Sequence, residues 1–435
     1  MRELNPKRPA VLLGSASSGG TLAAMRHLDS YGVGVNIIAD HTFCAAGWSH
    51  CAAHHYKGPV ESDSIGYLAR LLAIGKADPG QVLLPTSDEL VWLYTSNASL
   101  LARYFRLYQP SLETIKRILD KALLEKAATT AGLAVLPSWD PQSLDELAEL
   151  APRLPYPVLI KPRTHVHRLR NDKGVVVHSP DELAAEYPRF LARERYRFDD
   201  TPRAPNAVRP VIQQFVEIGR EGVISISGFI GRSADVFVTR RSTKILQRSR
   251  PVGVGVCYES CPADPALSEA VYRLCRELGY FGLFEVEFIL HDGAWAIIDF
   301  NPRLFNQIGL DLRRGLPLPM LAYLDALGET DALHTLAATA GRENPAEKVV
   351  FCDNFTLHAI LLAQALCMRA RLKDLAHWQS WARQNRAHMV HFASDHSDPM
   401  PGIIHILSEL YLGFRAAPRF VRTMLPSSPL VARGL

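Results

Sequence analysis

Acidic side chains alternate with apolar ones in two neighbouring stretches of this chain. Glu285 and Glu287 stand at alternate positions in the first stretch, and Asp299 and Asn301 do so in the second. A half-buried strand rarely carries such acids unless a cation neutralises them. Glu287, Asp299 and Asn301 would offer two carboxylates and an amide oxygen, which suit Mg²⁺ holding substrate phosphates. A solvated hairpin face, whose acids pair with nearby arginines, is the alternative.

The turn between these stretches decides whether the acids meet. Residues 291–293 read His-Asp-Gly, which is typical of a tight hairpin turn. A two-residue loop would pair Glu287 with Ile298 and turn Asp299 to the opposite face. A three-residue loop would pair Glu285 with Asp299 and bring all the acids to one face, so we predict the three-residue loop.

The N-terminal part predicts a parallel sheet. Strands are expected at 9–14 and 33–38, with a helix over 21–31 between them, and a third strand at 81–85. The turn at 15–20 is rich in Ser and Gly and could cradle a carboxylate or a phosphate, or simply be a tight turn.

The middle of the chain mixes strands with helices, which indicates an α+β arrangement for 115–325. A helical stretch over 111–132 contains Lys121, and a strand at 157–162 carries Lys161 near its end. A further strand spans 211–215, and 223–240 predicts a hairpin. Beyond residue 329 the pattern is helical, and an apolar helix is expected at 403–412. That helix would pack on the body or a second subunit, or lie at a membrane interface.

Composition is that of an ordinary globular protein and favours several small domains. The chain has 435 residues and a formal net charge of only +4, so nucleic acid is not an expected partner. We expect no membrane span, because no apolar run is long enough, and a cytoplasmic location, because residues 1–8 lack the core of a secretion signal. Seven scattered cysteines indicate no disulfide framework. His and Cys residues at 41–55 could bind zinc, but no spacing matches a known ligand pattern, and core cysteines or a loop that lines a cleft account for them better.

The order of these features resembles the ATP-grasp ligases, which include biotin carboxylase, D-alanine–D-alanine ligase, the carbamoyl phosphate synthetase large subunit and D-aspartate ligase. The likeness covers roughly residues 10–325 and rests on five motifs in order, the acidic hairpin being the last. It implies an α/β N-terminal domain (1–114, a parallel sheet of pre-ATP-grasp type), an ATP-grasp small lobe (115–210) and a large lobe with the magnesium site (211–328). A helical C-terminal region (329–435) would follow.

The resemblance also implies roles for individual residues. Lys121 would lie near the α-phosphate of ATP, and Lys161 would contact the α- and β-phosphates. The hinge between the lobes would be Gln213, Gln214, Phe215 and Val216, with the Gln214 and Val216 backbone on the adenine edge and Glu221 on the ribose. Glu287, Asp299 and Asn301 would bind Mg²⁺ (or Mn²⁺). Arg303, with Lys244, Arg248 or Arg250, would hold a substrate carboxylate and stabilise the transition state.

One segment departs from the family pattern. The loop that normally folds over the triphosphate is rich in glycine, whereas residues 163–173 contain none and are basic and rich in histidine. Side-chain cations could replace backbone N–H groups at the γ-phosphate, the loop could hold an anionic substrate, or it could fail to close in the usual way. The basic side chains of this loop are Arg163, His165, His167, Arg168, Arg170 and Lys173.

The activity that the resemblance implies is ATP-dependent ligation. A carboxylate would attack the γ-phosphate to give an acyl phosphate and ADP, and an amine or a thiol would then displace phosphate. The expected substrates are small molecules, amino-acid-like in kind, and a homodimer is compatible with the sequence. Carboxylation or carbamoyl-phosphate chemistry through carboxyphosphate is one alternative, and ATP binding without turnover is another.

Overall fold

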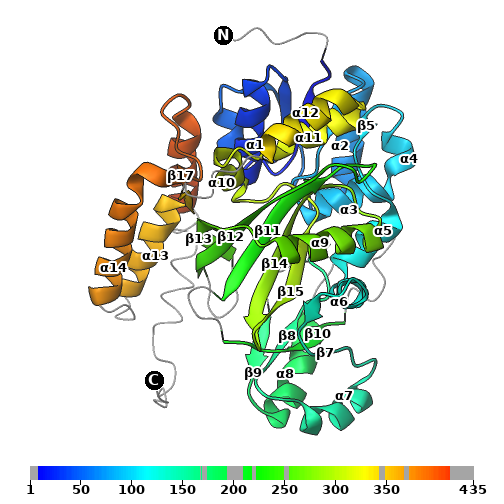
Figure 1. Cartoon of the computed structure of the whole chain (residues 1–435), viewed down its shortest axis with the longest axis vertical. Helices are drawn as coiled ribbons and strands as arrows, with labels where there is room; N and C mark the ends of the chain where they lie inside the picture. The colour runs from blue at the N-terminus through cyan, green and yellow to red at the C-terminus, as the bar shows by residue number, and fades with distance from the viewer. Residues whose placement is uncertain are drawn as a thin grey trace.

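Three β-sheets follow one another along the long axis of the molecule (Figure 1). The computed structural model describes residues 8–166, 168, 174–193, 209–217, 222–248, 254–341, 348–366 and 372–411. The N-terminal sheet lies at one end, a large mixed sheet occupies the middle, and a small antiparallel sheet lies at the other end.

The N-terminal sheet is parallel, as predicted. Its order is β3-β2-β1-β4-β5, with β1 at Val11–Leu13, β2 at Val35–Ala39, β3 at Ala52–Lys57, β4 at Val82–Leu83 and β5 at Arg106–Leu107. Its helices are α1 (Gly19–Ser30), η1 (Ala45–Trp48), α2 (Ser64–Ala77), α3 (Asp88–Ser96) and α4 (Ala98–Leu101). Helix α1 begins where Ser18 accepts a bond from the Gly20 N–H, and α3 where Ser87 accepts one from the Leu90 N–H.

The small sheet is antiparallel, with the order β7-β10-β8-β9. Its strands are β7 (Ser138–Trp139), β8 (Val158–Lys161), β9 (Val175–Val177) and β10 (Val211–Gln214). Helices α7 (Leu144–Leu150) and α8 (Pro180–Arg193) and the short η2 (Ala151–Arg153) accompany it. A core that includes Val158, Ile160, Phe190 and Ile212 fills the space between this sheet and α7 and α8.

The large sheet has eight strands in the order β17-β16-β13-β12-β11-β14-β15-β6. Its strands are β6 (Ala134–Val135), β11 (Val223–Ile230), β12 (Phe237–Arg248), β13 (Val254–Cys261), β14 (Gly282–His291), β15 (Ala294–Asn301), β16 (Val350–Cys352) and β17 (Met389–His391). A core that includes Phe284, Val286 and Phe288 on β14 packs against Val271 and Leu274 of α9 (Pro265–Leu278). The opposite face of β14 is therefore the one that carries the acids.

The predicted helix over 111–132 is in fact two helices. Helix α5 (Leu112–Leu119) ends at Asp120, and the Asp120 side chain caps the next helix, α6 (Lys121–Thr130), by accepting from the N–H groups of Ala122 and Leu123. The cap places Lys121 at the first position of α6 instead of on an exposed helix face.

The region after residue 329 is helical, as predicted, but it also contributes to the large sheet. Its helices are α12 (Thr330–Ala340), α13 (Asn354–Leu366), α14 (Leu372–Gln384), the short η3 (Arg386–His388) and a helix over 400–411, and α10 (Ile308–Arg313) and α11 (Leu318–Leu327) precede them. Strand β16 pairs antiparallel with β13, and β17 pairs parallel with β16. The sequence analysis missed both strands, which are only three residues long.

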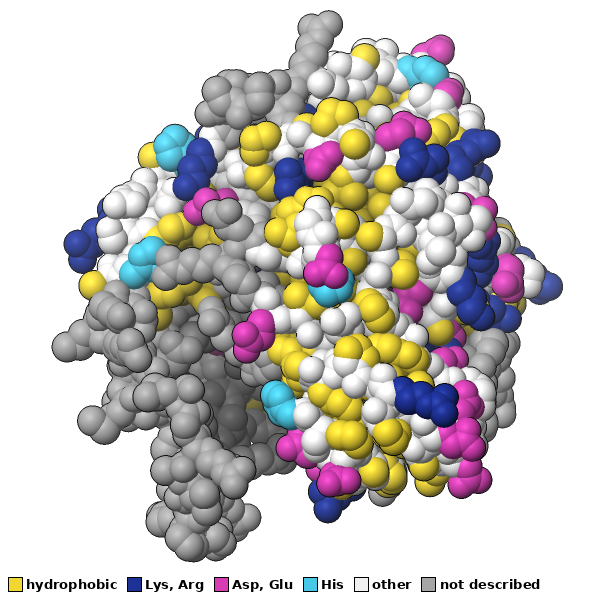
Figure 2. Space-filling view, turned by 60° about the horizontal axis from the view of Figure 1, so that its bottom comes forward, with side chains coloured by type: hydrophobic (Ala, Val, Ile, Leu, Met, Phe, Trp, Pro, Cys, Tyr) yellow, Lys and Arg dark blue, Asp and Glu magenta, His cyan; other side chains and the backbone are white. Residues whose placement is uncertain are grey.

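The surface carries both signs of charge. On the face drawn in Figure 2, acidic and basic side chains are interspersed among hydrophobic ones, in keeping with the small net charge. In the described ranges, no helix has both the length and the apolar character needed to cross a bilayer.

Candidate active site

A cavity of about 250 Å³ lies between the small sheet and the large one. Eleven of the residues singled out from the sequence line it: Lys121, Lys161, Gln213, Gln214, Phe215, Val216, Lys244, Glu287, Asp299, Asn301 and Arg303. Apolar side chains from both sheets form part of the wall, among them Leu136, Leu159, Val223, Ile289 and Ile298. The structure thus brings together residues that lie up to 182 positions apart along the chain.

The acids converge in this cavity, but not through the turn that we predicted. The loop has two residues, Asp292 and Gly293, because His291 pairs with Ala294, so the prediction of a three-residue loop is wrong. Both loop residues have positive φ (49° and 78°), as a primed hairpin turn requires.

A β-bulge corrects the register. Phe288 pairs with Ile297, and the next pair is Glu287 with Asp299, so Ile298 is the extra residue. Glu285 then faces Asn301, whereas we had expected it to face Asp299. The bulge therefore brings the acids to one face of the hairpin, which is the effect that we had expected from a three-residue loop.

Lysines pair with the two acids that face one another. The Lys121 Nζ lies 2.9 Å from the Asp299 Oδ1, and the Lys244 Nζ lies 2.6 Å from the Glu287 Oε1. Burial alone would lower the pKa of each lysine, but its carboxylate partner more than offsets this, so both pKa values lie above the ordinary value. Two cations and two carboxylates thus form a largely buried, neutral group that lines the cavity.

Glu285 is more deeply buried and is held by neutral donors. Ser225 donates to it at 2.7 Å, the Asn301 amide donates at 3.1 Å, and Gln307 donates as well. Burial and the neighbouring Glu287 raise the pKa of Glu285 to about 7. The Asn301 oxygen in turn accepts a bond from Arg303 at 2.8 Å, so both ends of this amide are engaged.

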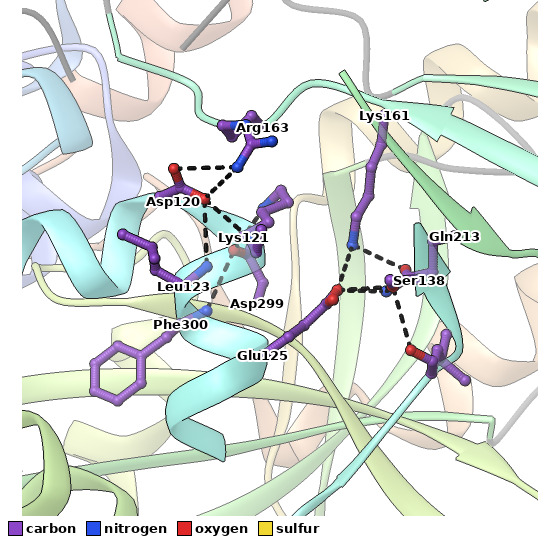
Figure 3. Close-up of polar contacts among 12 residues, drawn as sticks. Asp120, Lys121, Leu123, Glu125, Ser138, Lys161, Arg163, Gln213, Asp299 and Phe300 are labelled. Carbon is purple, nitrogen blue, oxygen red and sulfur yellow. Dashed lines mark hydrogen bonds and ion pairs between the residues drawn. The ribbon is translucent and has the colours of Figure 1, made fainter. Parts of the chain in front are cut away.

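Lys161 points into a different corner of the cavity (Figure 3). Its Nζ donates to the Gln213 Oε1 at 2.9 Å and lies 3.7 Å from the Glu125 Oε1. The pKa of Lys161 is lowered to about 8, chiefly by burial and also by the nearby Lys121, whereas Glu125 opposes the shift. Glu125 lies one helical turn beyond Lys121 on α6, a spacing from which the sequence analysis could have found it.

The hinge strand has part of its backbone already bonded. The Gln214 N–H donates to the Pro137 carbonyl at 2.8 Å, and the Phe215 N–H donates to the Pro157 carbonyl at 3.1 Å. The Gln213 side chain also donates to Glu125 at 2.9 Å. Gln213 therefore bridges Lys161 and Glu125.

Arg303 lies between the N-terminal sheet and the acidic hairpin. Its Nε donates to the Asp88 Oδ1 at 2.7 Å, and Asp88 is the first residue of α3. The sequence analysis treated Asp88 only as part of a helix cap and missed this ion pair, since no local pattern links positions 215 residues apart.

The basic loop contains one arginine whose role in the structure is clear. Arg163 is buried and forms ion pairs with Asp120 (3.2 Å) and with Asp140 (Figure 3). Its pKa lies above the ordinary value because these acids outweigh the effect of burial. Arg163 therefore fixes the start of α6 rather than facing the cavity.

Several predicted residues lie outside the described part of the chain. They are Glu221, Arg250, His167, Arg170 and Lys173, together with the side chain of Arg248, whose backbone belongs to β12. His165 is described and lines the cavity.

The stretch over 41–55 yields one group of possible metal ligands. His50, Cys51 and Asp398 place one ligand atom each within 4.8 Å of one another. Asp398, however, already accepts from the Arg26 Nε at 2.9 Å and from the Ser49 hydroxyl at 2.6 Å. These contacts join the C-terminal region to the N-terminal sheet, and they account for the acid without a metal.

No family model matches the chain, but curated relatives and solved structures do. The carbamoyl phosphate synthase large chain of Thermomicrobium roseum is 26% identical over 249 residues, which are 54% of this chain and 21% of that relative. The chain thus spans about a fifth of that relative's length.

Two solved structures share the fold. One is the biotin carboxylase domain dimer of the Hydrogenobacter thermophilus 2-oxoglutarate carboxylase with MgADP, ADP and bicarbonate (TM-score 0.59, 15% identity, 74% of this chain and 70% of that chain). The other is the L-amino acid ligase from Bacillus licheniformis (TM-score 0.58, 15% identity, 79% of each chain). These matches confirm the resemblance to the ATP-grasp ligases that the sequence showed, and the two solved structures share the fold of this chain.

Proposed function

We propose that this protein is an ATP-dependent ligase that joins a carboxylate to an amine or a thiol and releases ADP and phosphate. The observation that carries the proposal is the pair Glu287 and Asp299, which face one another across the bulge, each with a lysine. Carboxylates and lysines in one buried group suit a substrate that brings both phosphates and divalent metal.

The cavity residues fit Mg²⁺-ATP. Glu287 and Asp299 would hold Mg²⁺, with the Asn301 oxygen as a third ligand if Arg303 releases it. The metal would neutralise charge on the phosphate oxygens. Lys121 and Lys244 would then exchange their carboxylate partners for phosphate oxygens, and Lys161 would contact the α- and β-phosphates.

The adenine would lie at the hinge. Because the Gln214 N–H is bonded to Pro137, the groups proposed for the adenine edge are the Gln214 carbonyl and the Val216 N–H. Apolar side chains such as Leu159 and Ile289 would cover the faces of the ring. Glu221 is proposed for the ribose hydroxyls on the resemblance alone.

The substrate carboxylate would bind near Arg303 and Lys244, with Arg248 as a further candidate. Its oxygen would attack the γ-phosphorus as the bond to the ADP oxygen breaks, which gives an acyl phosphate. The amine nitrogen would then attack the acyl carbon, and phosphate would leave. The proposed domains are 1–114, 115–210, 211–328 and 329–435. A cytoplasmic location, amino-acid-like substrates and a homodimer belong to the same proposal.

The experiment is ADP release from the purified full chain with Mg²⁺-ATP and paired mixtures of carboxylates and amines. Ligation predicts release that requires both mixtures and a product heavier by the amine less one water. Release that requires bicarbonate instead would show carboxylation, and MgADP binding with no turnover would show a nucleotide-binding protein. A Glu287→Gln variant must lose whichever turnover is found, whereas the matched Asp292→Asn variant, on the exposed turn of the same hairpin, must keep it.

A further inference from the structure

The helix over 400–411 turns an apolar stripe to solvent. Its exposed side chains are Ile403, Ile406, Leu407, Leu410 and Tyr411, preceded by Met400, and each is 38–54% exposed. The spacing i, i+3, i+4, i+7, i+8 puts the last five on one face of the helix. Such a stripe normally faces a protein core.

The opposite face of this helix packs on the protein. Ile404 is buried, and a Cβ on Gly402 would meet the Ser394 Oγ at 3.1 Å. The His405 ring packs against Phe392, with centroids 4.5 Å apart, and its Nε2 lies 3.3 Å from the Asp353 Oδ1. These contacts hold the helix against the protein by one face, and its apolar stripe therefore faces solvent.

Two aromatic side chains of the N-terminal domain extend the stripe. Phe43 stacks on Tyr411, with ring centroids 6.5 Å apart and an angle of 20° between the rings. Trp48 lies close by, since its Nε1 donates to the Thr42 carbonyl at 2.7 Å. We call the six helix residues with Phe43 and Trp48 the apolar patch. It holds eight of the thirteen large hydrophobic side chains that the described ranges expose.

The sequence that follows the helix is strongly basic. Residues 412–435 contain four arginines, Arg415, Arg419, Arg422 and Arg433, and no Asp or Glu. The whole chain carries a formal charge of +4, so residues 1–411 have equal numbers of basic and acidic side chains. The excess of basic over acidic residues therefore comes entirely from the sequence after residue 411.

We propose that the apolar patch docks this protein on an anionic lipid surface. The stripe would enter the boundary between headgroups and acyl chains, and Phe43 and Trp48 would sit at headgroup level. The positive charge of the sequence that follows the helix favours a lipid surface of negative charge. A second copy of the chain would also cover an apolar face, but it would not account for four arginines and no acid in the sequence that follows the helix.

The test is flotation of the full chain with vesicles. Binding is expected to vesicles with 30% phosphatidylglycerol in phosphatidylcholine, and at least tenfold weaker binding to phosphatidylcholine alone. Ile403→Glu with Leu407→Glu should lower binding at least tenfold. The matched control is Ile65→Glu, on α2, which changes an exposed isoleucine outside the patch and should leave binding unchanged.

A second variant tests the charge separately. Changing Arg415, Arg419 and Arg422 to Gln should weaken binding to the anionic vesicles by about fivefold per arginine and leave the helix stripe intact. Three outcomes would overturn the proposal. The first is no binding to either kind of vesicle, and the second is lipid binding that the variant with Ile403→Glu and Leu407→Glu retains. The third is a wild-type dimer by light scattering that the same double variant converts to monomer without a change in lipid binding. None of these readouts depends on the proposed ligase activity.

Discussion

Arg303 and Asp88 join the end of the acidic hairpin to the start of helix α3 through a 2.7 Å ion pair. Both side chains are largely buried, and the same arginine also bonds the Asn301 oxygen. An arginine proposed to hold substrate is thus positioned by an acid at the start of helix α3, so the N-terminal part of the chain contributes to the geometry of the site.

Asp88→Asn should therefore lower both stability and activity. Loss of a charged hydrogen bond at a largely buried site should reduce the free energy of unfolding by about 2 kcal/mol, measured by urea denaturation. The proposed ligase should show a raised KM for its carboxylate. Glu89→Gln is the matched control, because it removes a charge from the same first turn of α3 and leaves the Asp88–Arg303 ion pair in place. Equal stability of the two variants would contradict the assigned role.

Asp299→Asn should weaken metal-dependent nucleotide binding. It removes one carboxylate from the facing pair and leaves Lys121 without its 2.9 Å charged partner. We expect the apparent affinity for MgADP to fall at least tenfold by calorimetric titration, as loss of an anionic ligand from an oxygen site implies. Asp292→Asn should not change it, since that side chain is on the turn and Asn tolerates its positive φ.

Nucleotide affinity should fall above pH 8 because of Lys161. Its pKa is about 8 in the free protein, and a bound phosphate would favour the charged form and raise that pKa. Binding would then take up a proton above pH 8, so affinity should be flat below pH 8 and drop about tenfold per pH unit above it. MgADP titrations from pH 6.5 to 9.5 give the profile. Lys161→Arg should flatten it, and an unchanged slope in that variant would assign the titration to another group.

Gly293→Ala should destabilise the protein by about 1 kcal/mol. Gly293 has φ of 78°, and a Cβ there would meet open space, so the cost comes from the backbone alone. Gly34→Ala is a suitable control, because Gly34 is not left-handed and an added Cβ would make ordinary contact with the Ala10 Cβ at 3.8 Å. Thermal unfolding of both variants checks the difference, and similar melting temperatures would argue against the two-residue turn.

The sequence predicted several of the elements that surround the cavity. The parallel sheet, the lysine at the end of β8 and the acidic hairpin were all visible as local patterns. The sequence pattern did not predict the bulge at Ile298, because isoleucine is common in regular strands and does not indicate a residue without a partner on the neighbouring strand. The alternation of acidic and apolar residues predicted that the acids would lie on one face of the hairpin. The order of residues along the chain could not predict the register in which the two strands pair.

Contacts between distant segments were the other part that the sequence could not give. Asp120 was included in one long helix, although its side chain ends α5 and caps α6. The short strands β16 and β17 carry too few residues for a period to show. The partners of Lys161 and Arg303 depend on how the sheets are arranged relative to one another.

The pairing of β16 with β13 has a practical consequence for anyone who wishes to shorten this protein. A truncation after residue 341 would strip β16 and β17 from the sheet that carries Glu287 and leave the backbone of β13 with unmet hydrogen bonds. Bare edges of this kind recruit strands from other molecules. A fragment that ends at residue 341 should therefore precipitate, whereas the whole chain of 435 residues should not.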